Sequence, residues 1–392
     1  MDSSGSRLWP FWSEIARAQV NDLIAGGDVT GTRMNPSVRT LEHLVEHTLA
    51  PGRHVLATGS GTAALTTAYA ALGLEVGAEV LAPAHTFRAT VTTLLPLGLV
   101  PVLCDTDPAT GGIDLEDAAE RVTGRTQAIV VTHMWGRPVP GGRLRSFADR
   151  HHLALVEDCS HAHGARFRGE PVGSRADVAV WSLGTTKIVS GGMLGAVATP
   201  HEQVFERALA FGQPKHRRPG IGSAMLRDVS ESGVGLNLRP SPVAALLAAD
   251  HLSRLDQILA LKNDRQMAVE EVVDQLPGLA PLPRAKGHDG GAFYKWHWTH
   301  PDERVLPMLA GAGLRVRRPA PGLHTLRLFT DPDLARSVLP VAPRVPVAGS
   351  YPTTDRFLAD LIEIDTREVY DPDHDPTPTY TEALARVTEH LR

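Results

Sequence analysis

The chain reads Leu153-Ala154-Leu155-Val156-Glu157-Asp158-Cys159-Ser160-His161 and, further on, Val178-Ala179-Val180-Trp181-Ser182-Leu183-Gly184-Thr185-Thr186-Lys187. The first apolar run ends in an acid, which predicts a buried strand that delivers a carboxylate. The second run delivers a serine and a lysine among small residues. A lysine in this setting is either a phosphate clamp or a Schiff-base lysine with a lowered pKa, although a surface loop is the plain alternative.

Strands alternate with helices on both sides of this stretch. We predict strands over residues 54–58, 79–83, 100–104, 127–132, 153–158, 178–183 and 195–199, and helices over 61–74, 87–97, 113–121 and 142–151. This alternation is typical of a mostly parallel, doubly wound sheet, and such sheets bind ligands beyond the carboxyl ends of their strands. Thr58, Asp158 and Ser182 all stand at such ends.

The pattern changes after Leu238. Residues 242–276 predict a long helix or a kinked pair, and residues 293–297 and 314–317 are short strand candidates in a proline-rich region. We therefore predict an α/β chain with a large domain over 26–244. Residues 1–25 and 245–392 are expected to form a smaller α+β domain.

A glycine-containing turn follows the first strand and reads Thr58-Gly59-Ser60-Gly61-Thr62-Ala63-Ala64. Backbone N–H groups and the helix N-terminus would favour an anion there, while a plain tight turn is the simpler interpretation. The segment also fits a dinucleotide fingerprint, which requires an acid at the end of the second strand. That strand ends Pro83-Ala84-His85, so the dinucleotide interpretation loses ground.

Asp158 offers a carboxylate that could pair with a pyridinium nitrogen, so that together with Lys187 it suggests pyridoxal phosphate. As an isolated residue Asp158 would more often be a helix cap. His161 alone would more often be structural. Phe87 follows a strand end and could stack on a flat ring, although a lone phenylalanine is more often part of a core.

Four motifs together resemble the sugar aminotransferases typified by DegT and StrS, which are fold-type I enzymes. They are Ser-Gly-Thr-Ala-Ala at 60–64, Glu-Asp-Cys-Ser-His at 157–161, the five-residue spacing from Ser182 to Lys187, and Gly235-Leu236-Asn237-Leu238-Arg239. The resemblance extends at least over residues 26–265. The chain departs from the family at Leu238, where tyrosine is usual, and at Met193, where many members have glutamate.

The resemblance implies pyridoxal 5'-phosphate as the cofactor and a role for each matching residue. Lys187 would be the Schiff-base lysine, Asp158 the partner of the ring nitrogen, and His161 the neighbour of the phenolic oxygen. Phe87 would stack on the ring. The residues implied at the phosphate are Gly61, Thr62, Ser182 and, from the neighbouring subunit, Asn237, so a homodimer with shared active sites is expected.

The resemblance further implies transfer of an amino group from L-glutamine or L-glutamate to a keto sugar or ketocyclitol in secondary-metabolite and antibiotic biosynthesis. A transaminase acting on 2-oxo acids is the nearest alternative. A nicotinamide oxidoreductase built on the glycine turn and a cofactor-binding regulatory protein are the alternatives from other classes. The sequence has no DNA-reading segment or stripe of basic residues that would support the regulatory protein.

Composition limits the class of protein and the partners that these interpretations allow. The 392 residues are 42% hydrophobic with a net charge of -5, which is ordinary for a soluble protein and gives no nucleic-acid footprint. Two cysteines, no signal-peptide pattern and no long apolar run predict a cytoplasmic protein without a membrane span. The acidic run at 371–375 lacks the glycine of a calcium loop, and the histidine pairs lack zinc-type spacing, so we expect no metal site.

Overall fold

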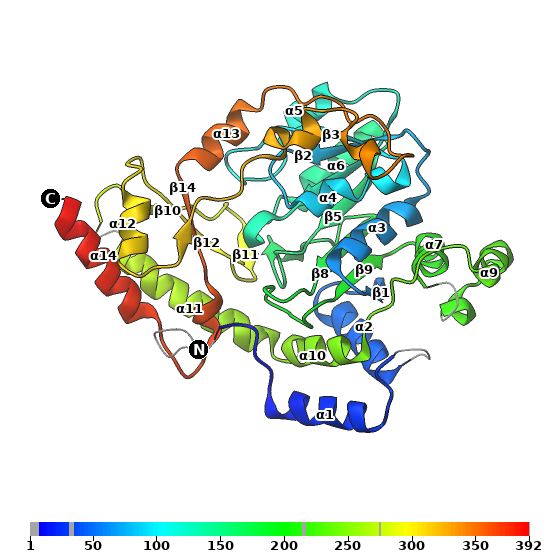
Figure 1. Cartoon of the computed structure of the whole chain (residues 1–392), viewed down its shortest axis with the longest axis horizontal. Helices are drawn as coiled ribbons and strands as arrows, with labels where there is room; N and C mark the ends of the chain where they lie inside the picture. Colours follow the sequence, from blue (N-terminus) through cyan, green and yellow to red (C-terminus); the bar gives the residue numbers. More distant parts are fainter. Residues whose placement is uncertain (1–7, 31–34, 214–216, 274–275, 392) are drawn as a thin grey trace.

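The computed structural model describes residues 8–30, 35–213, 217–273 and 276–391 (Figure 1). Its largest element is a seven-stranded sheet in the order β1-β9-β8-β5-β4-β2-β3. These strands are β1 His54–Thr58, β2 Glu79–Pro83, β3 Val100–Cys104, β4 Thr126–Thr132, β5 Ala154–Asp158, β8 Val178–Ser182 and β9 Gly195–Thr199. The five strands from β8 to β3 are parallel, and β9 runs antiparallel to both β8 and β1. The predicted α/β fold with a mostly parallel sheet is confirmed.

Helices cover this sheet on both faces, which explains why β2 and β9 are buried along their whole length (Figure 1). The helices of this part of the chain are α2 Pro36–Thr48, α3 Gly61–Leu72, α4 Arg88–Thr92, α5 Leu115–Glu120, α6 Gly141–His151, α7 Glu202–Gly212, α9 Ala224–Glu231 and α10 Pro242–Ser253. Of these, α9 packs on α7 and lies farther from the sheet (Figure 1). The alanine-rich α3 begins at the N-cap Ser60, whose side chain accepts the Ala63 N–H, and ends at Gly73 with φ of 70°.

Proline and backbone geometry account for two differences in helix length. The helix expected over 87–97 is split into α4 and a 3-10 turn at Leu95–Leu97, because Pro96 has no N–H and crowds the preceding turn. The stretch after Pro242 is the kinked pair, since α10 ends at Ser253 and α11 spans Leu255–Val273. Arg254 at the junction has φ of -117°, outside the helical range.

A second sheet of four strands lies toward the C-terminus in the order β10-β12-β14-β13, and every pairing in it is antiparallel. The strands are β10 Ala280–Pro281, β12 Trp296–Thr299, β13 Val316–Arg317 and β14 Leu361–Ile364. The helices of this part are α11, α12 Val305–Gly311, α13 Pro352–Ala359 and α14 Thr377–Leu391. Tyr380 of α14 packs on Trp296 and Trp298 with ring centroids 5.8 and 6.4 Å apart. The two expected strands start a few residues later than predicted, and β14 was not predicted.

A third, three-stranded sheet joins β6 Arg166–Phe167, β7 Glu170–Pro171 and β11 His288–Gly290. The 3-10 turns are η1 Leu95–Leu97, η2 Met134–Gly136, η3 Arg218–Gly220, η4 Leu323–Thr325, η5 Arg327–Phe329, η6 Leu334–Ser337 and η7 Arg367–Tyr370. Across the described ranges, no helix combines the length and the apolar character that crossing a membrane requires.

Two segments connect the parts of the chain. The N-terminal helix α1, Glu14–Ala25, packs on α10, and Trp9 stacks between His251 and Tyr370 with centroids 4.2 and 4.5 Å away. Residues 323–351 lie between β13 and β14 of the small sheet in sequence but share a core with Ala64 of α3 and Val80 of β2. The division at 244/245 stays a prediction, and this later segment packs on the large sheet.

Candidate active site

Seven of the eight predicted site residues line one cavity of about 660 Å³ at the carboxyl ends of β2, β5 and β8. They are Gly61, Thr62, Phe87, Asp158, His161, Ser182 and Lys187. This volume lies within the range of about 300–1,000 Å³ that is typical of ligand pockets. Parallel strands bring their carboxyl ends to one edge, so residues far apart in sequence meet there.

The N-terminus of α3 closes one end of the cavity. The first N–H groups of an α-helix have no partner within the helix, and Ser60 takes that of Ala63 at 3.0 Å. Gly61 and Thr62, in the first turn of the same helix, line the cavity together with Ser182. A helix N-terminus with a neighbouring hydroxyl is suited to a phosphate or another anion.

Gly61 allows Ser182 to approach this closely. A Cβ at residue 61 would lie 2.5 Å from the Ser182 Cβ and 2.8 Å from its Oγ. Gly61→Ala is therefore expected to lower the free energy of unfolding by about 1–3 kcal/mol, the usual effect of overpacking. Chemical denaturation measures it. Gly142→Ala in α6 is the matched control because a Cβ there meets nothing within 4 Å. Equal stability of the two variants would contradict the close approach.

Asp158 stands at the end of β5 and is 2% exposed. Its two oxygens accept hydrogen bonds from the Thr90 hydroxyl at 2.7 Å and from the Ser160 N–H at 3.0 Å. Thr86 in turn donates to Thr90 at 3.2 Å and bonds the Thr132 hydroxyl at 2.7 Å. This hydroxyl network fixes the direction of a buried carboxylate that lines the cavity.

His161 is held in one tautomer. Its Nδ1 accepts the backbone N–H of Trp135 at 3.2 Å, so Nδ1 carries no proton and the ring proton is on Nε2. Burial and the nearby Lys187 charge push the pKa of His161 well below its usual value. His161 is therefore a neutral donor within the cavity. Trp135, whose N–H donates to it, has φ of 58°, a left-handed conformation that non-glycine residues rarely adopt.

Lys187 is the half-buried lysine of the cavity. Burial lowers its pKa to about 8, the charge of Asp158 acts in the opposite direction, and Lys295 lowers it further. The Lys187 backbone N–H donates to Gly184 O at 3.0 Å, and its carbonyl accepts the Trp9 indole N–H at 2.6 Å. A lysine with this pKa is unprotonated in an appreciable fraction of molecules at neutral pH, as a nucleophilic or basic lysine requires.

The cavity residues from the C-terminal part were not predicted from the sequence. They include Tyr294, Lys295, Arg317 and Glu363. The Tyr294 ring stacks on His161 with centroids 4.5 Å apart, and its hydroxyl bonds Thr186 Oγ1 at 2.7 Å. The only sequence signals nearby were the two short strand candidates, which say nothing about which side chains reach the large sheet.

Phe87 and Asn237 differ in position. Phe87 lines the cavity and is 55% exposed, so its ring is available for stacking on a ligand. Asn237 does not line the cavity of its own chain. It is exposed, and its Oδ1 accepts the Arg239 Nε–H at 2.7 Å. Its predicted role toward a neighbouring subunit stays a prediction.

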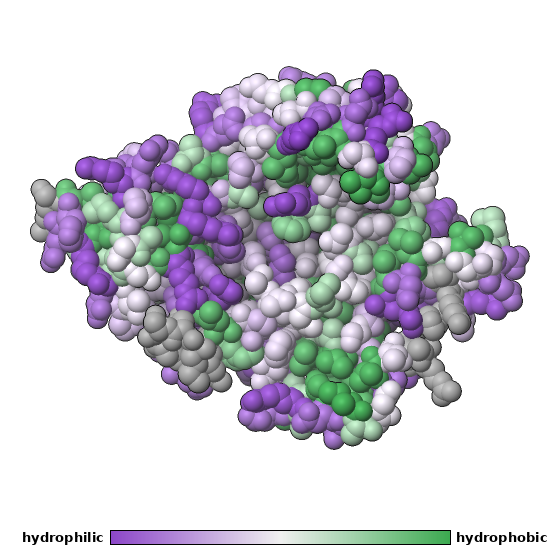
Figure 2. All heavy atoms as spheres, in the orientation of Figure 1, coloured by the Kyte–Doolittle hydropathy of each residue, from purple (hydrophilic) through white to green (hydrophobic). Residues whose placement is uncertain are grey.

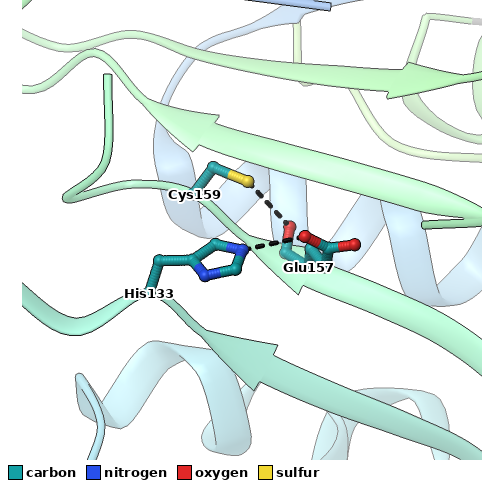
Figure 3. A group of neighbouring side chains, drawn as sticks. All are labelled: His133, Glu157 and Cys159. Atoms are coloured by element: carbon teal, nitrogen blue, oxygen red, sulfur yellow. Dashed lines mark hydrogen bonds and ion pairs between the residues drawn. The ribbon is translucent and has the colours of Figure 1, made fainter. Parts of the chain in front are cut away.

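A buried cluster of His133, Glu157 and Cys159 resembles a metal site in its residue types (Figure 3). His133 Nδ1 accepts the Val139 N–H at 3.0 Å, so its Nε2 carries the proton and donates to Glu157 at 2.8 Å. Glu157 Oε2 also accepts the Gly173 N–H at 2.8 Å, and burial raises the pKa of the Cys159 thiol well above its usual value. Hydrogen bonds within the fold therefore account for the positions of His133 and Glu157.

The fold and the cavity define an α/β enzyme in which a lysine and a buried carboxylate line one cavity at the strand ends of the sheet. The profile of the DegT/DnrJ/EryC1/StrS aminotransferase family matches residues 14–342. The chain belongs to this family and is an aminotransferase, as the sequence motifs predicted.

Individual relatives agree with this assignment. An L-glutamine:2-deoxy-scyllo-inosose aminotransferase of Streptoalloteichus tenebrarius is 29% identical over 352 residues, which is 85% of this chain and 83% of that protein. An enzyme of the same name from Streptomyces paromomycinus is 32% identical over 78% of this chain and 74% of its own. The crystal structure of DesI with its TDP-sugar product is 28% identical, with a TM-score of 0.74 over 99% of this chain and 94% of that chain.

Proposed function

We propose that this aminotransferase uses pyridoxal 5'-phosphate to move an amino group from L-glutamine to a hydroxylated cyclic ketone, a ketocyclitol or keto sugar, in secondary metabolism. The observation that carries the proposal is that Lys187, whose pKa is lowered to about 8, lines one cavity together with the buried Asp158. The names of the relatives, which pair L-glutamine with inososes, support the donor and the acceptor class.

The residues present fit this cofactor. Gly61, Thr62 and Ser182 would hold the phosphate at the N-terminus of α3, and Asp158 would hold the proton of the pyridine nitrogen. The Nε2–H of His161 is suited to the phenolic oxygen because its other ring nitrogen is already bonded. Phe87 would cover a ring face. The cofactor, when bound, supplies an electron sink for the substrate carbon that loses its proton.

Lys187 performs the proton transfers. Its amine, once free, removes the proton from the α-carbon of the donor and later returns a proton to the acceptor carbon, as a general base and then a general acid. Efficient transfer needs a pKa near the working pH, and burial lowers the pKa of Lys187 to about 8. Donor and acceptor then use the cavity in turn, which predicts ping-pong kinetics.

A substrate panel tests this function. Nucleotide-linked keto sugars, free ketocyclitols and simple 2-oxo acids would each be offered with L-glutamine and with L-glutamate. Turnover of a cyclic polyhydroxy ketone with L-glutamine is the expected result. Turnover confined to 2-oxo acids would show that the chain is an amino-acid transaminase and would overturn the proposed acceptor class.

We further propose a homodimer in which Asn237 serves the partner's cavity. Asn237 is exposed and follows the exposed apolar residues Val234 and Leu236. Apolar surface also gathers over α1 and near α7 and α9 (Figure 2). The exposed apolar residues of these helices include Ile15 and Ile24 of α1 and Met225 of α9. Exposed apolar patches of this kind are typical of interfaces between chains.

Mixing two inactive variants is the sharpest test of this arrangement. Lys187→Ala and Asn237→Ala subunits, unfolded and refolded together, should regain up to about one wild-type site per hybrid dimer, because one cavity then contains both Lys187 and Asn237. Each variant refolded alone is the control. Sedimentation of an active monomer, or no gain on mixing, would contradict the shared site.

We propose that the protein is located in the cytoplasm. Cys104 and Cys159 are both buried free thiols, which is the usual state of cysteines in a reducing compartment.

A further inference from the structure

A second lysine lies in the same cavity as Lys187. Lys295 immediately precedes β12 and lines the cavity together with Lys187. Both ammonium groups lie over the ring of Tyr294, with Nζ 4.6 Å from its centroid for Lys187 and 5.9 Å for Lys295. Two cations that share one aromatic ring are close enough to repel each other in a partly desolvated site.

The small sheet holds Lys295 in place. The Lys295 ammonium donates to Glu363 Oε1 at 2.5 Å, and Arg317 Nε donates to the same oxygen at 2.7 Å. In the strand register, Glu363 of β14 pairs with His297 of β12 on one side and with Arg317 of β13 on the other. The Lys295 side chain is 18% exposed and that of Glu363 6% exposed, so water screens this pair only weakly.

Other charged and titratable groups around Lys187 act differently. Asp158 at the end of β5 is the opposing negative charge. His161 and His163, in the loop after β5, are neutral because burial and the Lys187 charge lower both of their pKa values, that of His163 to about 3. Tyr294 is also neutral at pH 7, since burial raises its pKa. The cavity is also lined by Arg88, Arg317 and Arg318, but Lys295 is the cation whose charge lowers the pKa of Lys187 and so opposes Asp158.

We propose that Lys295, anchored by Glu363 on β14, is a positioning residue that keeps the Lys187 amine partly unprotonated through charge repulsion across Tyr294. The inference rests on the proposed function, in which Lys187 must act as a base. A residue next to the small sheet thereby affects the protonation of a lysine in the loop that follows β8 of the large sheet.

The electrostatics agree with the geometry. Burial lowers the pKa of Lys187 to about 8, Asp158 raises it, and Lys295 lowers it. Glu363 is ionised at neutral pH, since its pKa falls to about 2: burial raises it, but the neighbouring His297 ring, with Nε2 3.7 Å from Oε2, and the charge of Lys295 outweigh that effect. Glu363 thus partly neutralises Lys295 and limits the repulsion. Removing the charge of Lys295 should raise the pKa of Lys187, and removing the charge of Glu363 should lower it.

Competitive labelling of the full chain, freed of pyridoxal phosphate, measures this effect directly. Trace acetic anhydride acetylates only unprotonated amines, and mass spectrometry of the peptide that contains Lys187 gives its rate against pH. Lys295→Met should raise the pKa of Lys187 and slow its labelling at pH 7 by about threefold or more, whereas Glu363→Gln should speed it. Lys295→Arg retains the charge and should restore the wild-type curve.

The controls separate electrostatics from structure. Lys286→Met removes the same charge from an exposed position outside the cavity and should leave the Lys187 curve unchanged. Lys295→Met should fold because Glu363 keeps its bond to Arg317. An unchanged Lys187 pKa in Lys295→Met would overturn the inference. If the pKa shifts as expected while the wild-type chain shows no transamination with any substrate, the charge effect stands and the proposed function fails.

Discussion

Lys187→Ala is expected to abolish transamination while the protein still folds. The variant removes the amine that holds the cofactor and moves protons at the substrate carbon. General acid–base catalysis alone contributes about 10²–10⁴-fold, and the loss of covalent attachment adds to it. The Lys187 carbonyl, which accepts the Trp9 indole N–H at 2.6 Å, is unaffected by the substitution, so the backbone of this loop keeps its anchor.

Covalent trapping tests the assignment without relying on activity. Incubation with pyridoxal 5'-phosphate and then borohydride should add a stable mass to Lys187 in the wild-type chain and no mass at this position in the variant. Lys262 is the informative comparison, because it is also buried with a strongly lowered pKa but bonds Thr366 Oγ1 at 2.6 Å, outside the cavity. A trapped adduct on another lysine would refute the role of Lys187.

Most of the cavity that the large domain contributes could be predicted because its residues are tied to strand ends. Once 154–158 and 178–182 are strands of a parallel sheet, Asp158 and Ser182 must stand at the same edge. The glycine turn before α3 follows from the same reasoning, since a strand end, Ser60 and an alanine-rich run specify a helix start. The local sequence was therefore enough to predict that these residues lie at the edge of the sheet where the cavity is.

The contributions of the C-terminal part could not be predicted in this way. Lys295 and Glu363 approach Lys187 only through the packing of strands of two to four residues, and periodicity is not measurable over such lengths. The left-handed conformation of Trp135 also has no local signal in its residue type. It is held by tertiary contacts, because Gly136 next to it packs against Ala292 and His161.

One miss had a signal in the sequence. Pro96 lies inside the helix expected over 87–97, and a proline in a helix interior removes a hydrogen bond and breaks the helix there. The apolar pattern of this segment favours one long helix in spite of the proline. The structure instead has a short α4 followed by a 3-10 turn.

Asp158→Asn is expected to lower turnover by about 10²-fold or more with the fold intact. In the proposed enzyme, the carboxylate stabilises the protonated pyridine nitrogen and so makes the cofactor a better electron sink. Removing one partner of a buried charged pair costs about 3–5 kcal/mol, and each 1.36 kcal/mol on the barrier is about tenfold in rate. A neutral amide cannot hold that proton, so the loss falls on kcat.

The surrounding hydroxyls should tolerate the amide. In the Asp158→Asn variant the amide oxygen would keep the bond from the Ser160 N–H. The amide nitrogen would donate to Thr90, whose hydroxyl now donates to Asp158 Oδ2 at 2.7 Å. Thr90→Val is the matched control, because it removes that hydrogen bond but leaves the carboxylate charge, and its effect on kcat should be far smaller. Stopped-flow measurement of the donor half-reaction with L-glutamine isolates the step that needs the electron sink. Near-normal rates in Asp158→Asn would mean that the carboxylate only orders the backbone at Ser160 and plays no part in the chemistry.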